Sequence, residues 1–161
     1  MSRGENGEEA GLGGISRETL ASVREAVGAP DDRDARLRRV VTILSRANPH
    51  FSWTGIYLLQ GDVLVLHNQA GPPTPHERIP VGSGICGLAA RERRTVVVPD
   101  VSRDPRYLAC SLSTRSEIVV PIVREGAVVG EIDVDSDRPD AFGDEDRRLL
   151  EAVARLLAPI S

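Results

Sequence analysis

The sequence lacks an excess of basic residues, a long apolar run and a rich supply of cysteine. Among its 161 residues, 20 Lys and Arg stand against 24 Asp and Glu, for a net charge of −4. It therefore offers neither a basic field for nucleic acid nor a polybasic patch for a membrane surface. No apolar stretch approaches the roughly 20 residues of a membrane span, and the N-terminus has no signal-peptide apolar region. These absences predict a cytoplasmic protein that binds neither nucleic acid nor a membrane.

The sequence contains only two cysteines, Cys86 and Cys110. Cytosolic thiols are kept reduced, and a domain of this length is stable without a covalent cross-link, so no structural disulfide is expected. The two residues are either inert and buried or a working pair. Their spacing alone favours the inert reading, because free cysteine is commonly a small buried hydrophobe. Their positions beside small residues at the edges of elements, with Cys110 leading into the hairpin that carries the acids, favour the working pair. The three histidines, His50, His67 and His76, have no metal-ligand spacing with one another or with the cysteines, so no metal site is predicted.

Length and a hydrophobic fraction of 40% predict a single domain. Residues 1–15 are rich in glycine and glutamate with almost nothing apolar, which predicts a disordered tail. Residues 16–161 form the predicted domain, in which a helical N-terminal extension spans 16–48 and the core spans 51–161. Helical periodicity and stop signals predict the first helix from Ser16 to the Gly28-Ala29-Pro30 stop, and a second from Asp31 or Asp32.

The core reads as strands and helices in an antiparallel order. Apolar and β-branched runs predict strands near 51–59, 63–67, 95–98, 118–123 and 128–134. Further helices are predicted after Gly82 and after the acidic cap that precedes Leu149. The prolines of residues 71–80 exclude a central strand and predict an exposed loop. Helices at the ends around a mostly antiparallel sheet indicate an α+β fold.

The last two predicted strands form a hairpin, and three acids and a thiol are expected to gather at one end of it. Glu117 lies near the start of the hairpin, Asp133 and Asp135 lie near its end, and Cys110 stands just before it. Side chains alternate between the faces of a strand, so an odd-length connection would place Glu117 and both aspartates on the same face. An even connection would send Glu117 to the other face.

The acids of the hairpin have two readings. Glu131, Asp133 and Asp135 alternate with apolar residues, as the solvated face of any half-buried strand does. Aspartate is depleted in strands, however, and Glu117 placed opposite these aspartates would repel them unless a cation or a shared proton offset the charge. A cluster of this kind binds an ammonium group, and one member can remain protonated as a general acid.

The segment Gly82–Gly87 matches the glycine fingerprint of dinucleotide-binding folds in letters only. A proline-rich loop precedes it, whereas the fingerprint requires a buried parallel strand. The glycines instead predict a tight entry that places Cys86 in the first turn of a helix, where the helix dipole favours a thiolate. Trp53 and Tyr57, four positions apart on a strand, are expected on one side, either in the core or as walls of an apolar pocket.

Several motifs together resemble a GAF domain of the free methionine (R)-sulfoxide reductase type. They are Trp53–Tyr57, Gly82–Gly87, Val98–Val101, Cys110, Ser116–Pro121 and Ile132–Ser136. The resemblance covers about Ser52 to Leu157. It implies a GAF-like sheet whose N- and C-terminal helices pack together on one side, and an enzyme that reduces the free amino acid sulfoxide rather than a protein-bound one.

The resemblance also implies roles for individual residues. Cys110 matches the attacking cysteine and Cys86 a resolving one, which predicts a sulfenic acid and then a disulfide between them. Glu117, Asp133 and Asp135 match the acids that hold the substrate, with Trp53 and Tyr57 beside them. No cofactor is implied beyond an external reductant such as thioredoxin. Members often carry a third cysteine ten residues before the one matching Cys86; here that residue is His76.

Two other functions compete with the reductase. A ligand-sensing GAF module without catalysis usually accompanies an output domain, for which a chain of this length has no room. A dimerisation domain, with a homodimer formed through the terminal helices, would explain the apolar stripes of those helices. It would explain neither the thiols nor the acid cluster.

Overall fold

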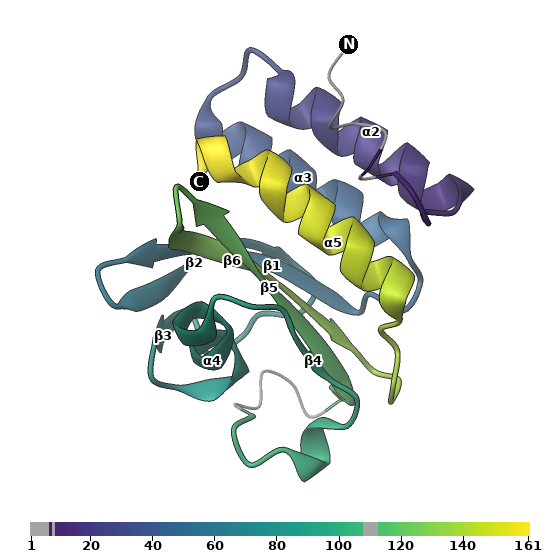
Figure 1. Ribbon diagram of the computed structural model, residues 1–161. Helices are drawn as coiled ribbons and strands as arrows, with labels where there is room; N and C mark the ends of the chain where they lie inside the picture. The colour runs from purple at the N-terminus through teal and green to yellow at the C-terminus, as the bar shows by residue number, and fades with distance from the viewer. Residues whose placement is uncertain (1–6, 8, 108–112) are drawn as a thin grey trace.

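The computed structural model describes residue 7 and residues 9–107 and 113–161, and it places the strands of that part of the chain in one antiparallel sheet (Figure 1). The sheet order is β3-β2-β1-β6-β5-β4. The strands are β1 Trp53–Gln60, β2 Val63–Ala70, β3 Arg78–Pro80, β4 Val96–Val98, β5 Ser116–Arg124 and β6 Ala127–Ser136. The helices are α2 Gly14–Gly28, α3 Arg33–Ala47, α4 Gly84–Glu92 and α5 Asp144–Leu157, with short 3₁₀ turns at Val101–Arg103 and Ala158–Ile160.

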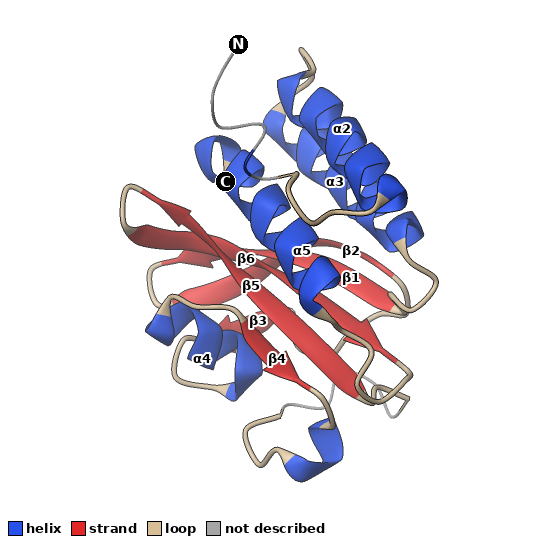
Figure 2. Cartoon of the chain, turned by 45° about the vertical axis from the view of Figure 1, so that its right-hand side comes forward, coloured by secondary structure: helices blue, strands red, loops and turns tan. Residues whose placement is uncertain are grey.

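The sheet separates two apolar layers. Helices α3 and α5 cover one face, with α2 packed on the outside of both, and α4 lies on the other face (Figure 2). The first layer packs Leu20, Leu44 and Leu150 of the helices against Ile132 and Val134 of β6. The second layer is smaller and contains α4 together with the opposite face of the sheet. The α+β arrangement with the terminal helices together on one side is therefore confirmed.

Two details differ from the sequence predictions. The helix predicted from Ser16, α2, begins at Gly14, and Leu12 before it is 5% exposed, so the chain packs against the helices earlier than its composition predicted. The backbone N–H of Gly13 donates to Glu145 at 2.7 Å, which ties this segment to α5. The proline-rich segment ends in the short edge strand β3, which was expected to be loop. Pro80 is tolerated because it closes an edge strand.

The hairpin of β5 and β6 turns through two residues. Glu125 and Gly126 have φ values of 53° and 79°, the pair of positive values that a type I′ hairpin turn needs. A bulge between Ile122 and Val123 then leaves Val129 without a counterpart on β5. The predicted odd connection is thus wrong for the turn itself, and the bulged residue supplies the odd position. Glu117 accordingly stands directly opposite Asp135.

Helix α4 lies close to the backbone that precedes it. A Cβ at Gly87 would lie 2.7 Å from the carbonyl oxygen of Val81 and 2.9 Å from that of Pro80. Only glycine allows this approach, which fixes the helix against the chain leaving β3. The approach determines where the adjacent Cys86 sits over the sheet.

Within the described ranges, the helices are all too short or too polar to cross a lipid bilayer.

We expect Gly87→Ala to destabilise the protein by about 1–3 kcal/mol, because backbone carbonyls cannot move aside as a flexible side chain can. Gly14→Ala is the matched control, since its Cβ would meet nothing within 4 Å, and alanine in a helix should be neutral or slightly stabilising. Urea unfolding measures both free energies. Equal stabilities for the two variants would contradict the close approach.

Candidate functional site

The acids and aromatic residues singled out in the sequence share one face of the sheet. In one cross-strand row Trp53 pairs with Asp135, and Asp135 pairs with Glu117. Asp133 lies two residues along β6 on the same face, and Tyr57 pairs with Glu131 two residues further on. These residues point to the α4 side because Ile132 and Val134, between them, point to the terminal helices. The predicted common face of Glu117, Asp133 and Asp135 is therefore observed.

The acids of this face are almost completely removed from solvent. Glu117 is 2% exposed, Asp135 is 1% exposed, and Glu131 and Asp133 are fully buried. Oxygen Oδ1 of Asp133 and both carboxyl oxygens of Asp135 and of Glu131 accept no hydrogen bond in the described part of the chain. A solvated strand face would show exposed carboxylates. The burial therefore favours the binding-cluster reading of these acids.

Cys86 lies in the first turn of α4 and points at this cluster. Its Sγ–H donates to Oδ2 of Asp133 at 3.4 Å, and the thiol is buried. Burial raises the pKa of Cys86 well above its ordinary value, and the neighbouring Asp133, Glu131 and Glu117 raise it further. The expectation that the helix N-terminus would favour a thiolate is wrong here, because desolvation and negative neighbours outweigh the dipole.

Burial also raises the pKa values of the acids. The pKa of Asp133 is well above its ordinary value because of burial and then the charge of Asp135. Burial raises the pKa of Asp135 to about 6, and burial raises that of Glu131 strongly. Carboxyl groups in this setting take up protons readily unless a positive charge joins them. The cluster therefore suits a cationic ligand or a proton-donating role.

A small cavity opens beside Asp135 and Trp53. It has a volume of about 90 Å³ and is lined by Ser52, Trp53, Pro72, Ser113, Thr114, Asp135 and Asp137. The indole N–H of Trp53 donates to the carbonyl of Pro72 at 2.9 Å, which holds the ring in place. Trp53 thus forms a wall of the cavity, as the pocket reading expected.

Tyr57 and Cys110 stand differently from the other predicted residues. Tyr57 is fully buried, and its hydroxyl donates to the backbone carbonyl of His76 at 2.8 Å. It supports the floor of the α4 layer and does not line the cavity beside Trp53. Cys110, predicted to be the attacking residue, lies outside the described residues. Ser113, three positions later, lines the cavity.

Sequence reasoning noted Glu131 but did not select it as a site residue. Glu131 is fully buried, and its charge acts on the Cys86 thiol. Two features of the sequence indicate it. Glu131 alternates with Asp133 and Asp135 at every second residue, which places it on the same face of the strand, and β6 contains no Lys or Arg. Its burial comes from α4, which packs over it from a distant part of the chain.

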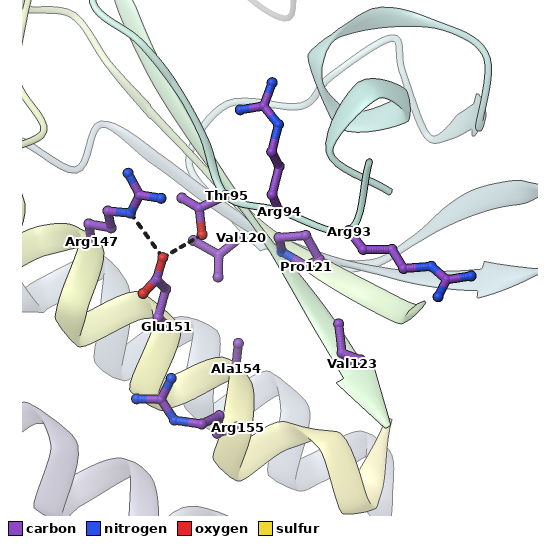
Figure 3. Close-up of a pocket in the computed structure, with 10 residues that line it drawn as sticks. All are labelled: Arg93, Arg94, Thr95, Val120, Pro121, Val123, Arg147, Glu151, Ala154 and Arg155. Atoms are coloured by element: carbon purple, nitrogen blue, oxygen red, sulfur yellow. Dashed lines mark hydrogen bonds and ion pairs between the residues drawn. The ribbon is translucent and has the colours of Figure 1, made fainter. Parts of the chain in front are cut away.

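A second concave region lies between the end of α4, β5 and α5 and contains four arginines (Figure 3). Its volume is about 320 Å³. Within it, Glu151 accepts hydrogen bonds from Thr95 at 2.7 Å and from Arg147 at 3.0 Å, and the labelled arginines extend in different directions. The guanidinium groups therefore do not converge on one ligand. The acid cluster under α4 remains the candidate site.

Comparisons with known proteins identify the family of the chain. The GAF domain family model matches residues 12–159. The chain is 38% identical over 118 residues to GAF domain-containing protein A of Dictyostelium discoideum, with 73% of this chain and 74% of that protein covered. It is 36% identical over 123 residues to free methionine-R-sulfoxide reductase of Escherichia coli strain K12, with 76% and 74% covered.

Solved structures of similar proteins have the same fold. Free methionine-R-sulfoxide reductase from Neisseria meningitidis in complex with its substrate matches with a TM-score of 0.84 at 37% identity, and the match covers 90% of this chain and 87% of that one. The reduced form of the Staphylococcus aureus protein matches with a TM-score of 0.83 at 32% identity, covering 90% and 94%.

The raised pKa of Asp135 predicts a stability that falls with rising pH. The native protein holds a proton that the unfolded chain releases between the ordinary pKa of 3.8 and about 6, so the free energy of unfolding falls across that window. The side chain of asparagine does not titrate, so Asp135→Asn removes this pH-dependent fall in the free energy of unfolding. Relative to wild type, the variant should gain roughly 1–3 kcal/mol between about pH 4 and about pH 7.

Urea unfolding at several pH values measures the gain. Asp62→Asn, in an exposed turn, is the control and should follow the wild-type curve. An Asp135→Asn curve parallel to wild type throughout would show that Asp135 titrates normally.

Proposed function

We propose that this chain, which belongs to the GAF domain family, reduces free methionine (R)-sulfoxide to methionine. Within that family it belongs to the free methionine-R-sulfoxide reductases. The observation that carries this proposal is the buried cluster in which the Cys86 thiol meets Asp133, with Glu117 and Asp135 in the adjoining row. The cluster supplies a thiol and a place for one positive charge, which are what a free amino acid sulfoxide requires.

The acids account for the choice of a free amino acid. The ammonium group of the substrate brings a positive charge, which a carboxylate among Glu117, Asp133 and Asp135 needs in order to ionise in a buried setting. A methionine sulfoxide within a protein has an amide nitrogen in that place, which carries no charge. Trp53, beside Asp135, offers an apolar wall for the side chain of the substrate.

The reaction divides into attack and resolution. The Cys110 thiolate attacks the sulfoxide sulfur, and the oxygen passes to Cys110 as it gains one proton, which leaves methionine and a sulfenic acid on Cys110. The Cys86 thiol then loses its proton and displaces water from the sulfenic acid, and this forms the Cys86–Cys110 disulfide. The sulfur of the substrate is reduced by two electrons, and the two thiols are oxidised by two. An external dithiol such as thioredoxin returns those electrons by exchange.

The surroundings of the thiol suit the second step. The Cys86 thiol already donates to Asp133, so Asp133 is placed to accept its proton during resolution. Burial and negative neighbours raise the pKa of Cys86, which keeps this thiol protonated until a partner arrives. A protonated member of the cluster can serve as the acid that the leaving oxygen needs.

The wider setting of the enzyme is part of the same proposal. The chemistry requires no cofactor beyond the external reductant, and a reducing cytoplasm supplies that reductant. A homodimer through the terminal helices would leave α4 and the acid cluster uncovered, because these helices lie on the other face of the sheet (Figure 2).

Turnover of separated sulfoxide epimers with thioredoxin or dithiothreitol tests the function. The free R epimer should be reduced, whereas the S epimer and N-acetylmethionine sulfoxide, which has no ammonium charge, should be poor substrates. Equal rates on the free and the N-acetyl compound would remove the role given to the acids. Binding of the free amino acid without turnover would make the chain a ligand-sensing module instead.

The two cysteine variants should separate attack from resolution. Without reductant, Cys110→Ser should release no methionine, because the attacking sulfur is gone. Cys86→Ser should release about one methionine per subunit and then stall unless a small thiol is added. Methionine release and mass spectrometry of the wild-type product, which should contain the disulfide, provide the readouts. A single turnover that survives in Cys110→Ser and is lost in Cys86→Ser would reverse the two roles.

A further inference from the structure

The cluster under α4 holds more negative capacity than one ammonium group can balance. Four carboxyl groups and the Cys86 thiol are buried together, and Asp133, Asp135 and Glu131 have oxygens that accept no hydrogen bond in the described part of the chain. Buried polar atoms without partners are rare and point to a ligand. A substrate ammonium supplies a single positive charge. A divalent cation would balance two of the buried negative charges.

The geometry of three of these groups matches that of a metal site. A sulfur of Cys86 and carboxylate oxygens of Glu117 and Asp133 all lie within 4.8 Å of one another. The Sγ–Oδ2 separation between Cys86 and Asp133 is 3.4 Å. Two tetrahedral zinc ligands with ordinary Zn–S and Zn–O bonds stand about 3.5 Å apart. Within the described ranges this is the one group of three or more potential ligands that converges in this way.

The donor set selects the class of ion. A thiolate with carboxylates suits a borderline or soft cation such as Zn²⁺, whereas Mg²⁺ and Ca²⁺ prefer six or more oxygen ligands. Three protein ligands leave a fourth tetrahedral position open, as catalytic zinc sites do. The ligands come from α4, β5 and β6, which are regular elements in contact with one another. The site is thus largely formed before an ion arrives.

We propose that Cys86, Glu117 and Asp133 bind a thiophilic divalent cation, zinc in the first instance, in place of the substrate ammonium. Binding displaces the thiol proton of Cys86 to solvent and converts the sulfur to a metal-bound thiolate, with no change in oxidation state. The charge of Glu131 lies behind the site and adds to its attraction for a cation. Histidine and cysteine spacing in the sequence gives no sign of such a site, because two of its three proposed ligands are carboxylates.

Zinc at this position inhibits the enzyme, and this consequence alone rests on the proposed function. The ion occupies two of the acids that receive the ammonium group, so inhibition is competitive with the sulfoxide. It also ties up the resolving sulfur. Because the ion must displace protons from the thiol and the acids, affinity rises with pH. Zinc binding itself is measured without any turnover.

Single-thiol variants test the binding directly. The Cys110→Ser variant retains only Cys86, and Cd²⁺ should give it the ultraviolet absorption of a cadmium–thiolate bond at one ion per chain, displaced by Zn²⁺ and not by Mg²⁺. The Cys86→Ser variant should show no such band at the same concentrations. A band of equal strength and affinity in Cys86→Ser would overturn the site. In wild type, Zn²⁺ should protect Cys86 from alkylation, and unprotected Cys86 would also overturn it.

Variants of the carboxyl ligand distinguish a site from a lone thiol. In the Cys110→Ser background, Glu117→Gln should weaken Zn²⁺ roughly tenfold or more, and Glu18→Gln on the exposed face of α2 should leave affinity unchanged. Unaltered affinity in Glu117→Gln would reduce the site to a reactive thiol and overturn the proposal. Metal binding without turnover would refute the proposed function alone, and turnover without metal binding would refute this inference alone.

Discussion

The register between β5 and β6 is the constraint on which the site depends. It places Glu117 opposite Asp135, with Asp133 two residues further along β6 on the same face, all beneath α4. Carboxyl groups this close together and this deeply buried cannot all ionise unless a positive charge joins them. The cluster is therefore unstable as a set of anions and stable as acids, as a pair with an ammonium group, or as ligands of a metal ion. The same burial explains the raised pKa values and the protonated thiol of Cys86.

Two small features fix that register. The two-residue turn at Glu125 and Gly126 fits the twist of the strands, and the bulge at Val129 adds one residue. Without the added residue every side chain of β6 beyond it would point to the other face. Asp133 and Asp135 would then lie in the apolar layer of the terminal helices, and Ile132 and Val134 would face α4. Function and folding consequently select the same register.

The sequence predicted what is local and periodic. The hairpin, the common face of Glu117 with the aspartates and the helix at Cys86 follow from residue types and alternation. The raised pKa of Cys86 did not follow, because it results first from burial and then from carboxylates that lie 31 to 47 positions away in the chain. Burial of Leu12 and of Glu131 likewise depends on distant helices. Contacts between separate elements, which a single sequence does not display, decide these points.

The shortness of β4 has a consequence for association between molecules. β4 pairs only with Glu117, Ile118 and Val119, so the rest of β5 runs along the edge of the sheet in the described part of the chain. Pro121 provides no N–H there, and Arg93 and Arg94 line the same concave region. A β5 strand from a second molecule would find no backbone N–H to bond at Pro121, and its own arginines would repel those of the first molecule. This stretch of β5 is therefore a poor template for extending the sheet with a strand from a second molecule.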